Sequence, residues 1–338
     1  MDKLKVGVIG SGRIGKVHIE NIAVRISSAE VVAVADPFIE DAKKFAEQFG
    51  IESVSPDYND ILSNSEIEAV LICSPTDTHS QYIIEAAEAG KHIFCEKPLD
   101  LSLETIQIIL NAVEKAGVKL MVGFNRRFDP NFSKVKQMVK GGEIGDPHIL
   151  QITSYDPMPP PAEYVAVSGG MFLDMTIHDF DMARFVIDSE VKEVYAKANV
   201  LIDPAIGKAG DVDTAVTTLF FENGAIGTIA NSRQAVYGYD QRLEVFGSEG
   251  MVHVTNNTPD NHTHYNKLGS HGSLPLNFFM DRYTESYVVE IGEFISAILN
   301  NSDIPATGKD GLMSVAVGLA AKKSVAENRP VKMTEILP

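Results

Sequence analysis

The first third of the chain alternates short, continuous apolar segments with segments of helical spacing. The apolar segments predict strands buried on both faces, at residues 5–10, 31–35, 69–73, 91–95 and 120–123. The helical patterns between them cover residues 15–26, 42–49, 79–89 and 103–116. Strict alternation of strand and helix with short loops predicts a parallel sheet with helices on both faces. We therefore expect a doubly wound α/β domain over residues 1–123.

The pattern changes after residue 123. Residues 149–155 alternate like a half-exposed strand, a proline-rich loop follows, and residues 173–186 form one amphipathic helical pattern. Several strand patterns then run in series from 193 to 254, with Asn223-Gly224 as a hairpin turn. A polar, mobile loop is expected at 255–280, and helices at 286–299 and 311–327. Residues 124–338 are therefore expected to form a second α/β domain with a large, open, mostly antiparallel sheet.

Charge and composition exclude several classes of protein. The 338 residues include 29 Lys+Arg and 46 Asp+Glu, a formal net charge of −17, which argues against nucleic acid and anionic membranes as partners. No apolar run is long enough to span a membrane, and the N-terminus lacks the pattern of a signal peptide. The only cysteines, Cys73 and Cys95, lie in apolar runs and are expected to be reduced core thiols of a cytoplasmic protein, in preference to a disulfide or metal site.

A dinucleotide-binding motif lies between the first strand and the first helix. Gly10-Ser-Gly12-Arg-Ile-Gly15 has the spacing G-x-G-x-x-G, which permits a tight turn, close approach of a pyrophosphate, and close packing of helix on sheet. The N-terminus of the helix offers free N–H groups to the anion. Asp36 follows the second strand, where a carboxylate accepts hydrogen bonds from a ribose 2′-hydroxyl and repels a 2′-phosphate. The motif therefore favours NAD over NADP.

Three further side chains suit the oxidation of an alcohol. His178 follows Asp174 by four residues on a predicted helix, so the two lie on one face about one turn apart. Histidine is a suitable base near neutral pH, although the spacing alone also fits a surface ion pair. Lys97 lies at the carboxyl end of a predicted parallel strand, where doubly wound sheets bind ligands, and Pro98 after it fixes the turn.

Several segments, taken together, resemble the Gfo/Idh/MocA oxidoreductase family. They are the glycine motif, Ser74-Pro-Thr-Asp-Thr-His79 with Glu96-Lys97-Pro98, Gly123-Phe-Asn-Arg126-Arg127-Phe, and Asp174-Met-Thr-Ile-His178-Asp179-Phe-Asp181. The resemblance covers essentially the whole chain, and the Arg-Arg-Phe-Asp, Tyr237–Asp240 and Asp174–His178 segments most resemble inositol 2-dehydrogenases. It implies an N-terminal Rossmann domain and a C-terminal domain whose open sheet packs against another subunit, giving a homodimer or homotetramer.

The resemblance also implies a set of site residues. The catalytic residues would be Lys97, Asp174 and His178. The expected NAD contacts are Gly10, Gly12, Arg13, Ile14, Gly15, Asp36, Ser74, Thr76, His79, Glu96 and Lys97. The expected substrate contacts are Lys97, Arg127, Asp156, Asp174, His178 and Tyr237. No metal is expected, because hydride transfer in the family needs none, although His262, His264 and His271 gather in the polar loop.

The expected activity is NAD-dependent oxidation of a ring hydroxyl of a cyclitol, such as myo-inositol, to an inosose. His178 would act as the base, and Lys97 would stabilise the alkoxide. Two alternatives stay open at this point. One is a dehydrogenase of another sugar or sugar derivative, and the other is a regulator that binds NAD without turnover.

Overall fold

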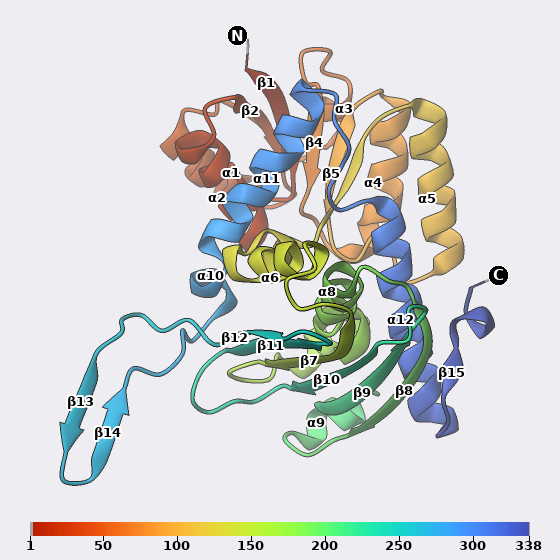
Figure 1. The fold of residues 1–338 in the computed structure, drawn as a ribbon. Helices are drawn as coiled ribbons and strands as arrows, with labels where there is room; N and C mark the ends of the chain where they lie inside the picture. The colour runs from red at the N-terminus through yellow and green to blue at the C-terminus, as the bar shows by residue number, and fades with distance from the viewer. Residues whose placement is uncertain (1–2, 338) are drawn as a thin grey trace. The chain divides into compact units, whose positions relative to one another are not determined.

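The computed structural model describes residues 3–337 and divides them into two compact units (Figure 1). One unit runs to Phe128 and includes Glu285–Val315. The other comprises Asp129–Thr284 and the chain from Ala316 onward. This division by packing differs from the division expected from the sequence pattern, because residues 285–315 pack with the first unit. The assignment of cofactor binding to residues 1–123 and substrate binding to residues 124–338 stays a prediction.

The first unit is built on a six-stranded sheet in the order β3-β2-β1-β4-β5-β6, and every pair of neighbouring strands is parallel. The strands are β1 (Leu4–Ile9), β2 (Ala29–Ala35), β3 (Ser53–Ser55), β4 (Ala69–Ile72), β5 (His92–Glu96) and β6 (Leu120–Gly123). The expected doubly wound parallel sheet is confirmed. Since β1 lies between β2 and β4, the strand order reverses beside β1, and ligands of such sheets bind at the carboxyl ends of the strands there.

Helices complete the first unit. They are α1 (Arg13–Arg25), α2 (Ile39–Ala46), α3 (Asn59–Leu62), α4 (Thr76–Glu88), α5 (Leu103–Ala116) and α11 (Thr284–Leu299), with 3-10 turns at Glu47–Phe49 and Asn125–Phe128. Helix α5 begins at the cap Ser102, whose side chain accepts from the Thr105 N–H, and ends at Gly117 in the left-handed conformation. Helix α11 joins this unit through Phe294, whose ring centroid lies 5.9 Å from that of Phe94 on β5.

The second unit is built on a seven-stranded sheet in the order β12-β11-β7-β10-β9-β8-β15. The strands are β7 (Pro147–Tyr155), β8 (Val191–Asn199), β9 (Thr214–Phe221), β10 (Ile226–Ser232), β11 (Asp240–Gly247), β12 (Met251–Val254) and β15 (Val331–Lys332). Only the central β7–β10 pair is parallel, so the expected mostly antiparallel sheet is confirmed. The predicted hairpin at Asn223-Gly224 joins β9 to β10, with Gly224 at φ +92°.

Helices pack against one face of this sheet (Figure 1). They are α6 (Pro130–Lys140), a π-helical turn (Met171–Met175), α8 (Ile177–Ile187) and the later part of α12 (Gly308–Glu327). The shorter elements are α7 (Ala162–Ser168), α9 (Pro204–Lys208), α10 (Phe279–Arg282) and a 3-10 turn at Met333–Glu335. Strand residues alternate between buried and more exposed positions, so the sheet keeps one open face.

Two expectations from the sequence pattern need correction. The predicted loop at 255–280 contains a two-stranded ribbon, β13 (Thr263–Asn266) and β14 (Gly269–Gly272), which forms an extended arm in Figure 1. Its side chains are all exposed, so hydrophobic alternation gave no signal. The predicted helix at 173–186 is a π-helical turn followed by α8. Both cysteines are free thiols. Cys95 is buried, as expected of a core thiol, whereas Cys73 is only partly buried.

Candidate active site

The glycine motif forms a tight turn between β1 and α1. Gly10 has φ +93°, and a Cβ there would lie 2.7 Å from the backbone carbonyl carbon of Cys73. A Cβ on Gly15 would lie 2.0 Å from the carbonyl oxygen of Gly10, whereas a Cβ on Gly12 would meet nothing within 4 Å. Gly12 precedes the first helical residue, and no side chain caps the helix. The turn therefore leaves open space beside the first N–H groups of α1, which suits a pyrophosphate.

Asp36 faces this turn from the end of β2. Its Oδ2 accepts hydrogen bonds from the Ser11 N–H at 2.6 Å and the Ser11 hydroxyl at 2.8 Å. Its Oδ1 accepts from the Phe38 N–H at 2.8 Å. The carboxylate is thus held against the glycine turn, as a ribose-binding acid requires, and Oδ1, which accepts one of these three bonds, keeps a lone pair for a further donor.

The loops after β4 and β5 are joined by His79, which the resemblance placed among the NAD contacts. The His79 side chain is buried on α4, with Nδ1 2.8 Å from the Pro98 carbonyl oxygen and Nε2 2.9 Å from the Ser74 carbonyl oxygen. Burial lowers the pKa of His79. The Ser74 hydroxyl lies 2.6 Å from the Thr78 hydroxyl, and Thr76, at the start of α4, is half-buried.

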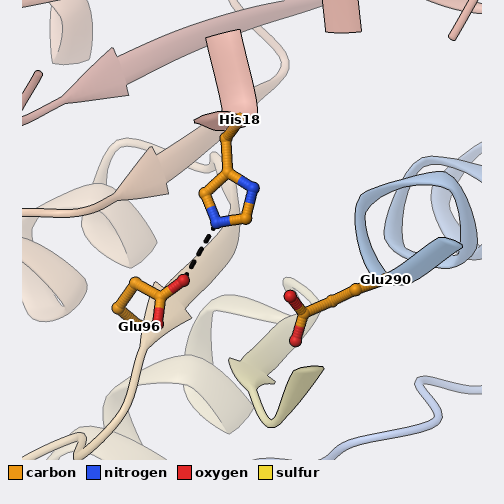
Figure 2. Close-up of side chains that lie close together, drawn as sticks. All are labelled: His18, Glu96 and Glu290. Atoms are coloured by element: carbon orange, nitrogen blue, oxygen red, sulfur yellow. Dashed lines mark hydrogen bonds and ion pairs between the residues drawn. The ribbon is translucent and has the colours of Figure 1, made fainter. Parts of the chain in front are cut away.

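Glu96 and Lys97 follow at the carboxyl end of β5. The Lys97–Pro98 peptide bond is cis, and Lys97 is half-buried. Glu96 Oε1 lies 2.9 Å from Nε2 of His18 on α1, and the carboxylate of Glu290 on α11 faces the same pair (Figure 2). Each of these three side chains has one atom that could bind a metal ion, and the three atoms lie within 4.8 Å of one another. Sequence reasoning did not bring them together, because α11 lies almost 200 residues beyond Glu96 in the chain.

Arg127 makes contacts within the first unit that anchor a loop. Its Nη1 donates to the Pro305 carbonyl at 2.9 Å, and its Nη2 lies 3.0 Å from Asp310 Oδ1. Burial opposes ionisation of Asp310, but the Arg127 charge and hydrogen bonds from Thr307 outweigh it and hold the pKa of Asp310 at about 2. These contacts are those of a structural ion pair, and the expected contact of Arg127 with substrate stays a prediction.

Asp174 and His178 are the half-buried positions of an otherwise buried segment in the second unit. Asp174 lies in the π-helical turn and His178 in α8, while Met171 to Leu173 and Met175 to Ile177 are buried. The turn begins at Gly170, which has φ +76°, and the Met171 N–H donates to Asp211 at 2.8 Å. Both polar side chains therefore lie on helical elements, the π-helical turn and α8, and both remain partly exposed to solvent.

A buried arginine links Asp174 to Asp156, and sequence reasoning missed it. Arg233 Nη1 donates to Asp156 Oδ2 at 3.2 Å, and its Nη2 lies 3.6 Å from Asp174 Oδ2. The Tyr164 hydroxyl donates to Asp174 Oδ1 at 3.0 Å. Arg233 follows β10 and Asp156 follows β7, and these strands pair in parallel although they are 77 residues apart. No local pattern in the sequence reveals that pairing.

Tyr237 uses its hydroxyl within the second unit. It donates to Asp240 Oδ2 at 2.6 Å, and burial together with this bond raises the pKa of Tyr237 to about 12. Asp240 also accepts from Arg242 and Asn256. The expected substrate contact of Tyr237 is not addressed by these bonds and stays a prediction.

The histidines of the arm do not gather into a three-ligand group. His264 and His271 face each other across the two strands, with ring centroids 6.4 Å apart, and His262 hydrogen-bonds Asp260. Among residues 3–337, the group of three or more possible metal ligands is His18, Glu96 and Glu290. Within the same residues, no helix is long and apolar enough to cross a membrane.

Comparison with known proteins identifies the family. Residues 4–124 match the model of an oxidoreductase family with an NAD-binding Rossmann fold, and residues 132–253 match the GFO/IDH/MocA C-terminal domain. The chain is 48% identical to a myo-inositol 2-dehydrogenase of Thermotoga maritima, over 99% of this chain and 100% of that protein. It is 46% identical to an inositol 2-dehydrogenase of Rhizobium meliloti, over 98% and 99% of the two chains.

Solved structures of related proteins share this fold over nearly the whole chain. The crystal structure of a probable dehydrogenase from Thermotoga maritima matches with a TM-score of 0.97 at 48% identity, over 99% of this chain and 100% of that chain. A scyllo-inositol dehydrogenase from Lactobacillus casei, with bound NAD(H) and scyllo-inositol, matches with a TM-score of 0.91 at 31% identity, over 98% and 100% of the chains. The glycine turn, the matched models and these relatives together show that the chain belongs to the Gfo/Idh/MocA family of NAD-dependent oxidoreductases.

Proposed function

We propose that this enzyme oxidises a secondary ring hydroxyl of a cyclitol, myo-inositol or an isomer, to an inosose. The proposal rests on two half-buried polar residues four positions apart, Asp174 and His178, in a chain related to inositol dehydrogenases. The first of them, Asp174, also lies beside the buried Arg233. Relatives acting on myo- and scyllo-inositol favour a polyol ring and leave the isomer open.

The first unit fits NAD. Gly10 and Gly15 leave no room for a side chain, Gly12 leaves open space, and Asp36 is held beside the turn. In the proposed reaction these residues hold the dinucleotide, with Arg13, Ile14, Ser74 and Thr76 as further contacts. When bound, NAD supplies the acceptor for the hydride that leaves the substrate carbon.

Side chains of the protein take up the hydroxyl proton of the substrate in the proposed reaction. In the proposal, His178 accepts the hydroxyl proton through a ring nitrogen, and Asp174 orients the imidazole. Lys97 donates a hydrogen bond to the oxygen as alkoxide charge develops. The substrate thereby loses a hydride from carbon and a proton from oxygen, which balances the formation of a ketone. Asp156, Arg127 and Tyr237 are the proposed contacts for the remaining hydroxyls.

The test is reduction of NAD by the purified protein with a panel of polyols. We expect turnover with at least one of myo-, scyllo- and chiro-inositol and little with glucose, xylose or UDP-sugars. NADP, run in parallel, should be the poorer cofactor because Asp36 would repel a 2′-phosphate. Turnover with a sugar and with no inositol would overturn the cyclitol assignment in favour of another sugar dehydrogenase. NADH binding without any turnover would favour a regulator.

The free thiols indicate the cellular compartment of the enzyme. Both cysteines are free thiols, and thiols persist in reducing compartments, so we infer a cytoplasmic enzyme. Oxidation of Cys73 or Cys95 in the protein isolated directly from cells would contradict this assignment.

A further inference from the structure

The tripeptide Glu96–Lys97–Pro98 lies between two buried histidines of the first unit. His18, on α1, is 0% exposed and contacts the Glu96 carboxylate. His79, on α4, is 1% exposed and contacts the Pro98 carbonyl oxygen. Each neighbour of Lys97 in the chain is therefore tied to a different helix, and both ties are made by imidazole nitrogens.

The two rings are themselves fixed in place. His18 packs edge-on against Phe94 at 5.2 Å and Tyr287 at 5.9 Å between ring centroids, so its Nε2 faces Glu96 in one orientation (Figure 2). His79 lies with its Nε2 2.9 Å from the Ser74 carbonyl oxygen, on the side of the ring opposite the Nδ1 contact. Burial lowers the pKa of His79, and the two carbonyl oxygens that face its ring nitrogens oppose this shift.

We propose that His18 and His79 are positioning residues for Lys97: they hold the turn on both sides of the lysine, so that its ammonium group meets the reacting oxygen. This inference rests on the proposed role of Lys97 in the reaction. A lysine side chain has a long, flexible stem, and its ammonium group is placed reproducibly only if its backbone is fixed. A displacement of about 1 Å at a reacting group lowers rate by up to about 100-fold.

Asparagine and glutamine substitutions separate this role from simple packing. The amide nitrogen of asparagine occupies nearly the place of histidine Nδ1, and that of glutamine nearly the place of Nε2. His79→Asn should therefore keep the bond to Pro98, while His79→Gln keeps only the bond to Ser74. At position 18 the two substitutions exchange roles, because Nε2 of His18 makes the Glu96 contact. His18→Gln therefore keeps the bond, and His18→Asn loses it.

We expect the asparagine and glutamine variants to rank in opposite order of kcat at positions 79 and 18. We expect kcat for polyol oxidation to fall about 10- to 100-fold in His79→Gln and His18→Asn, and by less than about 5-fold in His79→Asn and His18→Gln. KM for NAD and the dissociation constant for NADH should change little in the two His18 variants, because His18 is not among the expected NAD contacts. Equal losses from asparagine and glutamine at each position, tracking the thermal stability of the variants, would show packing alone and overturn the proposal.

A second readout keeps the inference separate from the proposed function. In protein labelled with ¹³C at lysine Cε, the Lys97 signal is assigned by its absence from Lys97→Arg, and its position reports the surroundings of the ammonium group. We expect this signal to shift or broaden in His79→Gln and His18→Asn, and to stay in place in the other two variants. An unmoved signal in all four would overturn the positioning role. Absence of wild-type turnover with every polyol, beside a shifted signal, would overturn the proposed function alone.

Discussion

At the scale of single residues, the candidate chemistry depends on charges that lie far apart in the sequence. Asp174 and His178 were predictable because they are four residues apart on one helical segment. Arg233 was not, because its position beside Asp156 and Asp174 depends on the parallel pairing of β7 with β10. Glu290 was missed for a similar reason, since α11 returns to the first unit from late in the chain.

Arg233 should matter for both activity and stability. It is 3% exposed and approaches two carboxylates, so Arg233→Met leaves them without that positive charge. Breaking a buried ion pair by removing one partner costs about 3–5 kcal/mol. We expect Arg233→Met to unfold at a clearly lower temperature, and Arg233→Lys to stay folded with kcat/KM for the polyol at least about 10-fold lower, because lysine lacks the two-pronged geometry. Wild-type kinetics in the lysine variant would contradict this.

At the scale of elements, the sequence pattern located most of the first unit. The alternating apolar runs correspond to β1, β2, β4, β5 and β6, and the helical pattern at 103–116 corresponds to α5. The pattern missed β3, because Ser53–Ser55 is short and partly exposed. It missed the β13–β14 ribbon for lack of a buried face, and the π-helical turn because its apolar spacing resembles that of an α-helix.

The glycine turn offers a matched pair of substitutions at this scale. Alanine favours a helix interior over glycine by about 1 kcal/mol, so propensity alone predicts that Gly15→Ala is tolerated. Gly12 is the N-cap of α1 and lies outside the helix. The geometry predicts otherwise for Gly15, where a Cβ would lie 2.0 Å from the Gly10 carbonyl oxygen. We expect Gly15→Ala to lower the melting temperature. Gly12→Ala should melt like the wild type and weaken NADH binding, because its methyl group occupies the space beside the pyrophosphate.

Thermal unfolding and NADH titration of the two variants check this prediction. The protein has no tryptophan, so NADH fluorescence is measured against a weak protein background. Equal stability of the two variants would contradict the packing role of Gly15, and unchanged NADH affinity of Gly12→Ala would contradict the placement of the pyrophosphate.

At the scale of the whole molecule, the open face of the second sheet presents an apolar row. Ile226, Ile149 and Phe246 lie side by side on β10, β7 and β11, and each is more than 40% exposed. Adjacent exposed apolar side chains are typical of surfaces that meet a partner. We therefore propose that this face packs against a second copy of the chain, in a homodimer or homotetramer.

A charge placed in this row tests the oligomer. We expect Ile149→Lys to shift the protein toward a smaller species in sedimentation velocity, because each interface would bury a lysine without a partner. Val24→Lys, at a 65% exposed position on α1, is the matched control and should leave the mass unchanged. A monomeric wild type, or an Ile149→Lys variant with the wild-type mass, would contradict the assignment of this face.

The rate of NAD reduction by an inositol in the His178→Ala variant decides whether this histidine is the base. We expect kcat to fall about 100- to 10,000-fold, the contribution typical of a general base, while NADH binding is retained. His264→Ala, at an exposed histidine on β13, should keep the wild-type rate. A His178→Ala variant that oxidises the inositol as fast as the His264→Ala control would contradict the assignment of His178 as the base, and with it the proposed mechanism.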